Sequence, residues 1–452
     1  LEICSRYYGA GAAPARLELG ALAAGAGLRP EQAAVEAWTP YARRQWGRLS
    51  ASAATQPEVL QQLRALPARA WERLRLALEA SDWMAEVLIR RPALASALAL
   101  DDAAAPPQPA SGGDFAAGMA DLRLWRLRET LRLLCMEWEQ RTPIEASLRA
   151  HSLVAEQTLR AAWAMLAPPS PSLAVLALGR LGLRELDLQS DLDLVFVAAS
   201  SEREAASRAA ASFIQILTAY TQAGSLYAVD TRLRPGGREG ELVQTRESLS
   251  QYFRQRAGAW EAVSYLKARL VAGNSEVGGA ALQAVAAATA PRLAGQDLRQ
   301  EFARLRQRME REGRPGRWGL KTGPGGYYDV DFLLSRRLLQ AGLPGRPGQG
   351  LADWARGLPA ALLPAEVSSE LADLTSLLRA ADHALRVATG KAGSSLPATG
   401  AAVERAWAWL ARVQELEAQA RTGAPPAPGA AAVDGARARI REIYLGWSDE
   451  KQ

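Results

Sequence analysis

The pattern of apolar and polar positions along the chain is helical at both ends and changes in the middle. Between residues 115 and 165, apolar side chains recur at spacings of three and four, which predicts a long amphipathic helix. They are Leu124, Leu127, Leu131, Leu134 and Trp138. The helical spacing returns after residue 276, with a clear stripe over 298–309. We therefore expect helices over most of the chain.

The middle of the chain carries short apolar runs with the composition of β-strands. These runs are LAVLAL at 173–178, LDLVFV at 192–197 and the alternating segment SLYAVDTRLRP at 225–235. A helix at about 203–222 separates the second run from the third. We expect a small α/β domain within an otherwise helical protein.

Together these segments predict an α+β protein, mostly α, in which a small mixed-sheet domain is flanked by helical bundles. Residues 101–114 have the composition of a linker, since they are rich in Pro, Gly and Ser. The expected regions are an N-terminal helical region at 1–100, that linker, a helical lead-in at 115–169, the α/β domain at 170–275 and a C-terminal helical domain at 276–452.

The composition limits the chemistry that this chain can perform. Two cysteines, Cys4 and Cys135, form neither a disulfide framework nor a zinc motif, so we expect a reducing cytoplasm. Only two histidines are present, His151 and His383, which makes a histidine-based catalytic site hard to build. If the protein is an enzyme, carboxylates and a metal ion are the expected carriers of the chemistry.

The net charge of +6 does not by itself indicate nucleic acid, because arginines alternate with glutamates along the helices, as over 304–312. We therefore do not expect a nucleic-acid partner. No apolar run approaches the roughly 18 residues that a membrane span needs, so we expect no membrane association. The N-terminus lacks the layout of a signal peptide.

Asp191 and Asp193 flank Leu192 at the start of the second apolar run. In a strand, residues i and i+2 point to the same face, so these carboxylates would converge while Leu192 and Leu194 pack on the other side. Two adjacent carboxylates repel each other unless a cation lies between them, and Mg²⁺ prefers such ligands. A short motif of this kind is also common at solvated strand ends, so its surroundings decide its meaning.

The surroundings favour a phosphate site. A Gly179–Gly182 turn precedes the pair, and glycines let backbone N–H groups approach a phosphate. Asp230 follows on the third apolar run, with Arg232 and Arg234 at matching alternation. Arginine side chains match phosphate oxygens in geometry and charge, so these residues extend the predicted site.

Four blocks in order resemble the glutamine synthetase adenylyltransferase/adenylyl-removing family, within the DNA polymerase beta-like nucleotidyltransferase superfamily. The blocks are GRLGLRELDLQSDLDLVFV at 179–197, LYAVDTRLRPGGREGELV at 226–243, AWEAVSYLKARLVAGN at 259–274 and LKTGPGGYYDVDFLL at 320–334. Arg180 and Leu183 differ from the residues usual in this family, and so does Asp331.

The resemblance implies two Mg²⁺ ions and ATP as substrate. It implies that the catalytic and metal-binding residues are Asp191, Asp193 and Asp230. The residues expected on the nucleotide are Gly179, Arg180, Gly182, Ser190, Arg232, Arg234, Arg269 and Lys321.

The implied reaction is transfer of AMP to a tyrosine of glutamine synthetase, which regulates nitrogen assimilation. A PII signal protein is an implied regulatory partner. Two alternatives stay open: phosphorolytic removal of AMP from the same protein, and a catalytically degenerate helical signalling protein. Family members are typically about twice this long, and only one nucleotidyltransferase domain is recognised here.

Other polar residues have ordinary structural interpretations from the sequence alone. Glu261 and Lys267 are expected to form an exposed ion pair, and Asp187 a solvent-facing loop position. His383 is expected to be a packed helical residue. None of these is predicted to take part in the site.

Overall fold

The computed structural model describes residues 35, 38–107, 115–166, 172–313, 316–421 and 429–449. The chain forms two compact units, which are described separately. The smaller comprises Leu1–Glu79 and Ala85–Ala99, and the larger comprises Ala80–Met84 and Leu100–Gln452. The predicted chemistry lies in the larger unit.

The smaller unit is helical wherever it is described. Its elements are α3 (Pro40–Ala54), α4 (Pro57–Arg64), most of α5 (Ala68–Ala80) and of α6 (Asp82–Arg90), and the 3-10 helix η1 (Pro92–Ala99). Thr39 caps α3 by accepting a hydrogen bond from the backbone N–H of Ala42. The buried guanidinium of Arg73 donates to the carbonyl of Leu98 at 2.9 Å and so joins α5 to η1.

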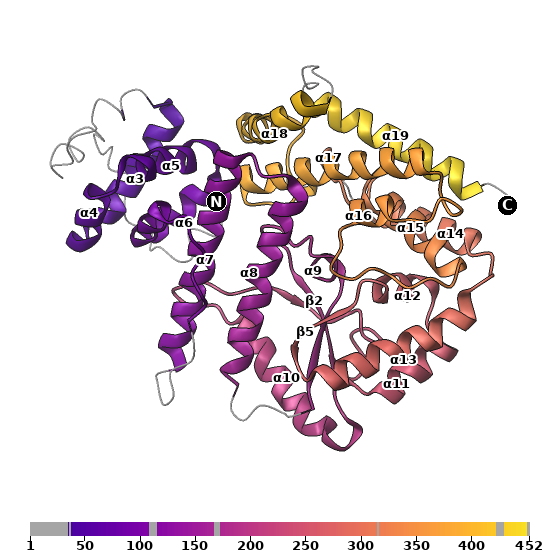
Figure 1. Cartoon of the computed structure of the whole chain (residues 1–452). Coiled ribbons are helices and arrows are strands. Elements are labelled where there is room, and N and C mark those ends of the chain that lie inside the picture. Colours follow the sequence, from indigo (N-terminus) through magenta and orange to yellow (C-terminus); the bar gives the residue numbers. More distant parts are fainter. Residues whose placement is uncertain are drawn as a thin grey trace. The chain divides into compact units, whose positions relative to one another are not determined.

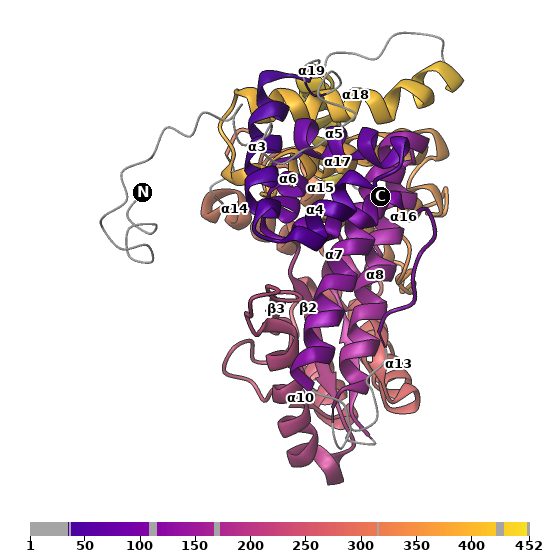
Figure 2. The same ribbon diagram turned by 90° about the vertical axis from the view of Figure 1, so that its left-hand side faces the viewer.

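The larger unit contains the remaining elements. Its helices are α7 (Phe115–Gln140), α8 (Ile144–Ala164), α9 (Gly179–Gly182), α10 (Arg203–Thr218), α11 (Arg246–Gln255), α12 (Ala259–Tyr265), α13 (Ser275–Leu293), α14 (Arg299–Glu312), α15 (Tyr327–Gln340), α16 (Leu351–Arg356), α17 (Ala365–Thr389), α18 (Ala401–Arg421) and α19 (Gly429–Asp449). Two short 3-10 helices are η2 (Ser200–Glu202) and η3 (Gly393–Ser395). Figure 1 shows α7 and α8 running side by side, and the view in Figure 2 agrees.

One mixed sheet lies in the described part of the larger unit. Its strands are β1 (Ala174–Ala177), β2 (Leu192–Val197), β3 (Val229–Asp230), β4 (Val243–Gln244) and β5 (Arg269–Gly273). The order is β3-β2-β1-β5, and β4 also pairs with β2. The strand β1 is antiparallel to β2 and β5, whereas β3 and β4 run parallel to β2.

Both faces of the central strands are covered by helices, which explains why they read as continuous apolar runs. Leu192, Leu194 and Phe196 pack in one core with residues of α7, α8 and α10. Val195 and Val197 pack in a second core with residues of α11 and α13. Asp193 shares the face of Val195 and Val197, at the end where β2 begins.

The C-terminal helices form a layer of their own. Within it, α17 contacts α16, α18 and α19, and α15 contacts α14 and α19. Figure 1 shows α17 and α19 in orange and yellow, and α17 also contacts α8. The C-terminal segment is therefore packed against the helical lead-in of the same unit.

The expected α+β, mostly helical class is confirmed, and several elements lie where the sequence placed them. The strands β1 and β2 and the helices α10 and α14 match the predicted segments. The third predicted strand is shorter than expected, since only two residues of 225–235 pair with β2. The strands β4 and β5 were not predicted. No helix in the described ranges is long and apolar enough to cross a bilayer.

Candidate active site

The structure brings the three predicted aspartates to one end of the sheet. Asp193 lies on β2 directly opposite Asp230 on the parallel strand β3. Asp191 lies two residues before Asp193, and its side chain is exposed. Asp191 directly precedes Leu192, the first residue of β2. The sequence pattern correctly placed Leu192 and Leu194 in the core.

Gly179 lies against the carboxylate of Asp193. It has a φ of +54°, and a Cβ built on it would overlap the Oδ2 atom of Asp193. The backbone N–H of Leu178 also donates to the carbonyl of Asp193 at 2.9 Å. Both the positive φ and this close approach require glycine. Gly182 ends the same turn. A side chain is also excluded there, because a Cβ would overlap the carbonyl oxygen of Lys267.

The electrostatic environment of Asp193 opposes its ionised form. Burial and then repulsion from Asp191 and Asp230 raise the pKa of Asp193 to about 6, although the Lys321 and Lys267 ammonium groups act in the opposite direction. A buried carboxylate whose ionised form is opposed by two neighbouring carboxylates belongs to a site that a bound cation would stabilise. The shift also shows that both lysines are close enough to act on Asp193.

Asp230 is already paired with a guanidinium. Arg232 donates from Nε to both carboxylate oxygens of Asp230 at 2.9 and 2.8 Å, and its backbone N–H donates to Oδ1 at 2.8 Å. This hydrogen bonding lowers the pKa of Asp230. Arg232 was expected to contact the nucleotide. In the structure it is bonded instead to the carboxylate of Asp230, which a metal ion would need as a ligand. Its side chain is 58% exposed, so it has room to turn away.

The other arginines expected on the nucleotide are bonded to groups of the protein instead. Arg234 donates to the carbonyls of Thr231, Arg238 and Gly240, and so holds the loop after β3. Arg180 pairs with Asp382 at 2.7 Å. Arg234 and Arg180 therefore stabilise the loop after β3 and the Gly179–Gly182 turn.

Arg269 acts in a similar way. It donates to Glu156 at 2.6 Å and to the carbonyls of Leu181 and Gly182. It therefore joins the Gly179–Gly182 turn to α8. Arg269 was expected to contact the nucleotide because of its position in the family's sequence block, but its guanidinium is bonded to these groups of the protein.

Ser190 and the lysines complete the surroundings. The hydroxyl of Ser190 is buried and has no hydrogen-bond partner among the described residues. The ammonium of Lys321 lies 5.5 Å from the ring centroid of Tyr328. Lys267 was expected to be exposed, but it is 6% exposed, and its Nζ lies 2.5 Å from Oδ2 of Asp331. Glu261 is not its partner, since that carboxylate accepts from Tyr252 and Gly258.

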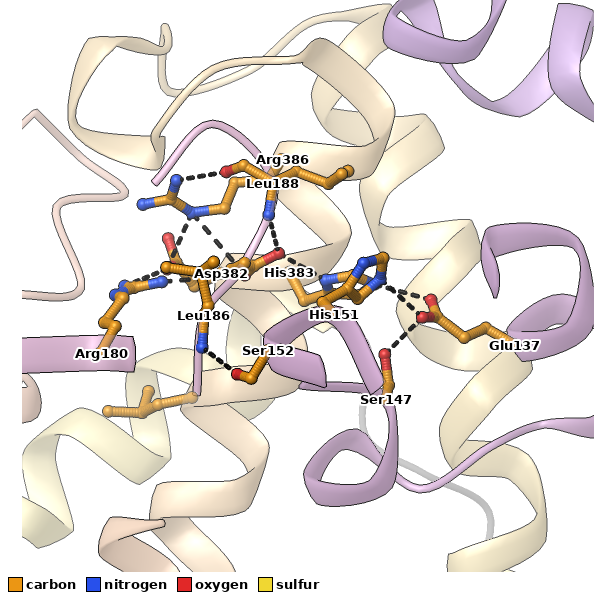
Figure 3. Close-up of polar contacts among 12 residues, drawn as sticks. Glu137, Ser147, His151, Ser152, Arg180, Leu186, Leu188, Asp382, His383 and Arg386 are labelled. Carbon is orange, nitrogen blue, oxygen red and sulfur yellow. Dashed lines mark hydrogen bonds and ion pairs between the residues drawn. The ribbon is translucent and has the colours of Figure 1, made fainter. Parts of the chain in front are cut away.

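A buried polar cluster next to the segment between the Gly179–Gly182 turn and β2 was not predicted from the sequence. Figure 3 shows His383 and His151 beside Glu137. The two ring nitrogens of His383 lie 2.7 Å from the carboxylate of Asp187 and 2.8 Å from that of Glu137. His151 contacts the other oxygen of Glu137 at 2.9 Å. Asp187 was expected to face solvent, but it is 5% exposed. The signal that could have revealed this cluster is a charged stripe on α17.

This cluster also brings potential metal ligands close together. In the described residues, the ligand atoms of Glu137, His151 and His383 lie within 4.8 Å of one another, and Asp191, Asp193 and Asp230 form no group as close as this. Both ring nitrogens of His383 already face carboxylates, which suits a charged imidazolium. Burial opposes that charge, but Asp187 and Glu137 outweigh it and raise the pKa of His383 to about 10. A proton-bridged ion-pair network therefore accounts for the cluster without a metal.

Sequence comparison connects this geometry to a known family. Residues 71–284 match the sequence model of the family described as "Glutamate-ammonia ligase adenylyltransferase". Residues 71–284 belong to this family. The matched segment includes all five strands and the three aspartates.

Individual relatives align with this chain over differing lengths. Three of them, each named "Bifunctional glutamine synthetase adenylyltransferase/adenylyl-removing enzyme", illustrate the range. The protein of Xanthomonas campestris pv. campestris strain B100 is 35% identical over 222 residues, which is 45% of this chain and 23% of the relative. That of Ralstonia nicotianae is 34% identical over 298 residues, or 59% and 31%. That of Mycobacterium tuberculosis strain H37Rv is 38% identical over 178 residues, or 38% and 17%. The alignments thus span less than a third of these relatives' own lengths.

Proposed function

We propose that this chain is an Mg²⁺-dependent nucleotidyltransferase that moves AMP from ATP to a tyrosine hydroxyl of glutamine synthetase. The observation that carries the proposal is the pairing of Asp193 with Asp230 on parallel strands, with Asp191 two residues away. Membership of residues 71–284 in the adenylyltransferase family supports the same chemistry.

The residues present fit a hard cation. The raised pKa of Asp193, caused by burial and by Asp191 and Asp230, is what a carboxylate cluster shows when it lacks a counter-charge. Asp191 and Asp193 would hold the ion, and Asp230 would join them once Arg232 releases it. When bound, Mg²⁺ neutralises charge on the phosphate oxygens and on the leaving group. We expect two ions to bind, and titration with Mn²⁺ would count them.

The chain's own residues would bind and orient the reactants. Lys321, and Lys267 behind it, place positive charge beside Asp193, where the triphosphate would lie. Arg232, after leaving Asp230, would meet the phosphate oxygens with its planar guanidinium. The Gly179–Gly182 turn leaves the backbone next to Asp193 free of side-chain bulk. Electrostatic stabilisation of this kind is the main task in phosphoryl transfer.

The proposed step forms one bond and breaks one bond. The tyrosine oxygen bonds to the α-phosphorus of ATP while the bond from that phosphorus to the bridging oxygen breaks, and pyrophosphate leaves. We assign the released Asp230 carboxylate as acceptor of the phenolic proton. The pKa of Asp230 is lowered by Arg232, so this role requires Arg232 to turn away first.

Removal of AMP is the competing direction, because the names of the relatives include both activities. The two directions separate in a paired assay with purified glutamine synthetase. Transfer requires ATP and Mg²⁺ and releases pyrophosphate. Removal requires adenylylated glutamine synthetase and phosphate, and it releases ADP.

The matched variants for this assay are Asp193→Asn and Asp121→Asn. The second alters an exposed carboxylate on α7, so wild-type activity is expected for it. AMP transfer that is lost only in Asp193→Asn supports the proposal. AMP removal without transfer would assign the reverse reaction, and neither activity would favour a signalling role. Adding a PII-type signal protein to the same assay tests the proposed regulatory partner, and the cytoplasm is the proposed compartment.

A further inference from the structure

The buried face of α17 carries four charged residues that the proposed reaction does not use. Arg379, Asp382, His383 and Arg386 stand at positions i, i+3, i+4 and i+7 of the helix. This spacing places them on one face. All four are less than 9% exposed, so the face is buried against other parts of the unit.

That face contacts the segment between the glycine turn and β2. Arg379 pairs with Glu185, and Arg386 donates to the carbonyl of Leu188 at 2.7 Å. His383 holds Asp187 at 2.7 Å between these two contacts. The segment 185–188 is therefore held by three side chains of a helix almost 200 residues further along the chain.

The glycine turn is tied to the same helix. Arg180 lies 2.7 Å from Asp382, which also accepts from Arg386 at 3.1 Å. Figure 3 shows Arg180, Asp382 and Arg386 grouped on one side of His383. Both ends of the segment that leads to Asp191 are thus fixed by α17.

Asp187 connects these contacts to the start of β2. Its Oδ1 atom accepts from the backbone N–H of Leu188 at 2.7 Å, and its carbonyl accepts from Ser190 at 3.1 Å. Ser190 directly precedes Asp191. The position of the Asp191 and Asp193 carboxylates therefore depends on where Asp187 is held.

His383 is suited to hold Asp187 because it is anchored on its other side. Its second ring nitrogen lies 2.8 Å from Glu137 on α7, and Glu137 is fixed in turn by His151 and by the hydroxyl of Ser147. A charge-assisted hydrogen bond from an imidazolium to a carboxylate is stronger than a neutral one. The chain Glu137–His383–Asp187 links α7, α17 and the loop before β2.

We propose that His383 is a positioning residue for metal and nucleotide binding, acting through Asp187 on Asp191 and Asp193. The expected effect of His383 on catalysis rests on the proposed function. Its expected effect on the segment 185–188 does not. This role of His383 makes the C-terminal helix α17 a structural part of the site.

The test compares His383→Gln with His151→Gln in the full chain. Both remove a buried histidine that contacts Glu137, but only His383 contacts the loop. Asp187→Asn is the second variant, because it weakens the same ion pair with little change in shape. The readouts are Mn²⁺ affinity, hydrogen exchange of the Leu188 and Ser190 amides, and kcat and KM for ATP.

We expect His383→Gln and Asp187→Asn to weaken Mn²⁺ binding about 10-fold or more, as outer-shell substitutions at metal sites do, and to speed exchange of both amides. In kinetics, kcat falls more than KM changes. His151→Gln keeps wild-type Mn²⁺ affinity, although its stability falls. Equal losses of Mn²⁺ affinity in both histidine variants, or no loss in either, would overturn the proposal. If the wild-type protein transfers no AMP, the proposed function fails while Mn²⁺ affinity and exchange still decide the role of His383.

Discussion

Asp193 and Asp230 are register partners on β2 and β3, two strands that run parallel from the same end of the sheet. The sequence separates them by 37 positions, and the fold places their side chains on neighbouring strands. A pair of acids in this arrangement repels itself in the absence of a cation. The charge of Asp193 therefore has consequences for stability as well as for catalysis.

We predict that Asp193→Asn stabilises the metal-free protein at pH 8 but not at pH 4. Burial, Asp191 and Asp230 raise the pKa of Asp193 to about 6 from an ordinary 3.8, so its ionisation opposes folding increasingly between pH 3.8 and about 6, and fully above that. The penalty is about 3 kcal/mol at pH 8 and vanishes below the ordinary pKa, where the carboxyl is protonated in both states. Thermal unfolding at both pH values measures it. Equal melting temperatures of wild type and variant at pH 8 would contradict this prediction.

Gly179→Ala tests the close approach of the turn to Asp193. The left-handed φ of +54° and the overlap with the Asp193 carboxylate both oppose a side chain, so we expect a loss of about 1–3 kcal/mol in stability. AMP transfer is expected to fall by about 10²-fold, because the added methyl group would displace the Asp193 carboxylate by roughly an ångström. Gly279→Ala on α13 is the control, since a Cβ there meets nothing within 4 Å. It should be neutral or stabilising by up to about 1 kcal/mol.

Several elements could be predicted from the sequence because their signals are local. The strands β1 and β2 are apolar runs between turn residues, and α14 has a clear stripe. The strands β4 and β5 could not be predicted in the same way. β4 has two residues, and β5 follows α12 so closely that the segment reads as one helix.

The partners of the arginines could not be predicted either. An arginine side chain reaches carboxylates or carbonyls that only the fold brings near, as Glu156 is brought to Arg269 and Asp382 to Arg180. The buried role of Lys267 depends in the same way on Asp331, 64 positions later. By contrast, the proximity of Asp191 and Asp193 was predictable because they are two residues apart, whereas the pairing of Asp193 with Asp230 depends on the sheet.

Arg232→Gln is predicted to separate metal binding from transfer. Removing the guanidinium frees Asp230 and raises its pKa toward the ordinary value, since Arg232 is the main cause of its lowering. We expect Mn²⁺ to bind several-fold more tightly without nucleotide, because a charge at hydrogen-bond distance no longer competes. AMP transfer should nevertheless fall, because the phosphate loses its arginine. Weaker Mn²⁺ binding in the variant would argue that Arg232 does not block the site.

Lys267→Gln is predicted to destabilise the larger unit strongly. It leaves Asp331 buried without its cation, which costs about 3–5 kcal/mol at sites of this kind. Arg308→Gln is the matched control. Its ion pair with Glu312 is 71% and 63% exposed, and such pairs contribute less than about 1 kcal/mol. Chemical denaturation of both variants checks the contrast, and a similar small loss in each would mean that Lys267 is not required for the fold.

The most direct test of the account is transfer of label from ATP to glutamine synthetase, with ATP labelled in either the α- or the γ-phosphate. The account predicts Mg²⁺-dependent labelling from the α-phosphate alone, which is lost in Asp193→Asn and kept in Asp121→Asn. Labelling from the γ-phosphate, or α-labelling that persists in Asp193→Asn, would contradict it.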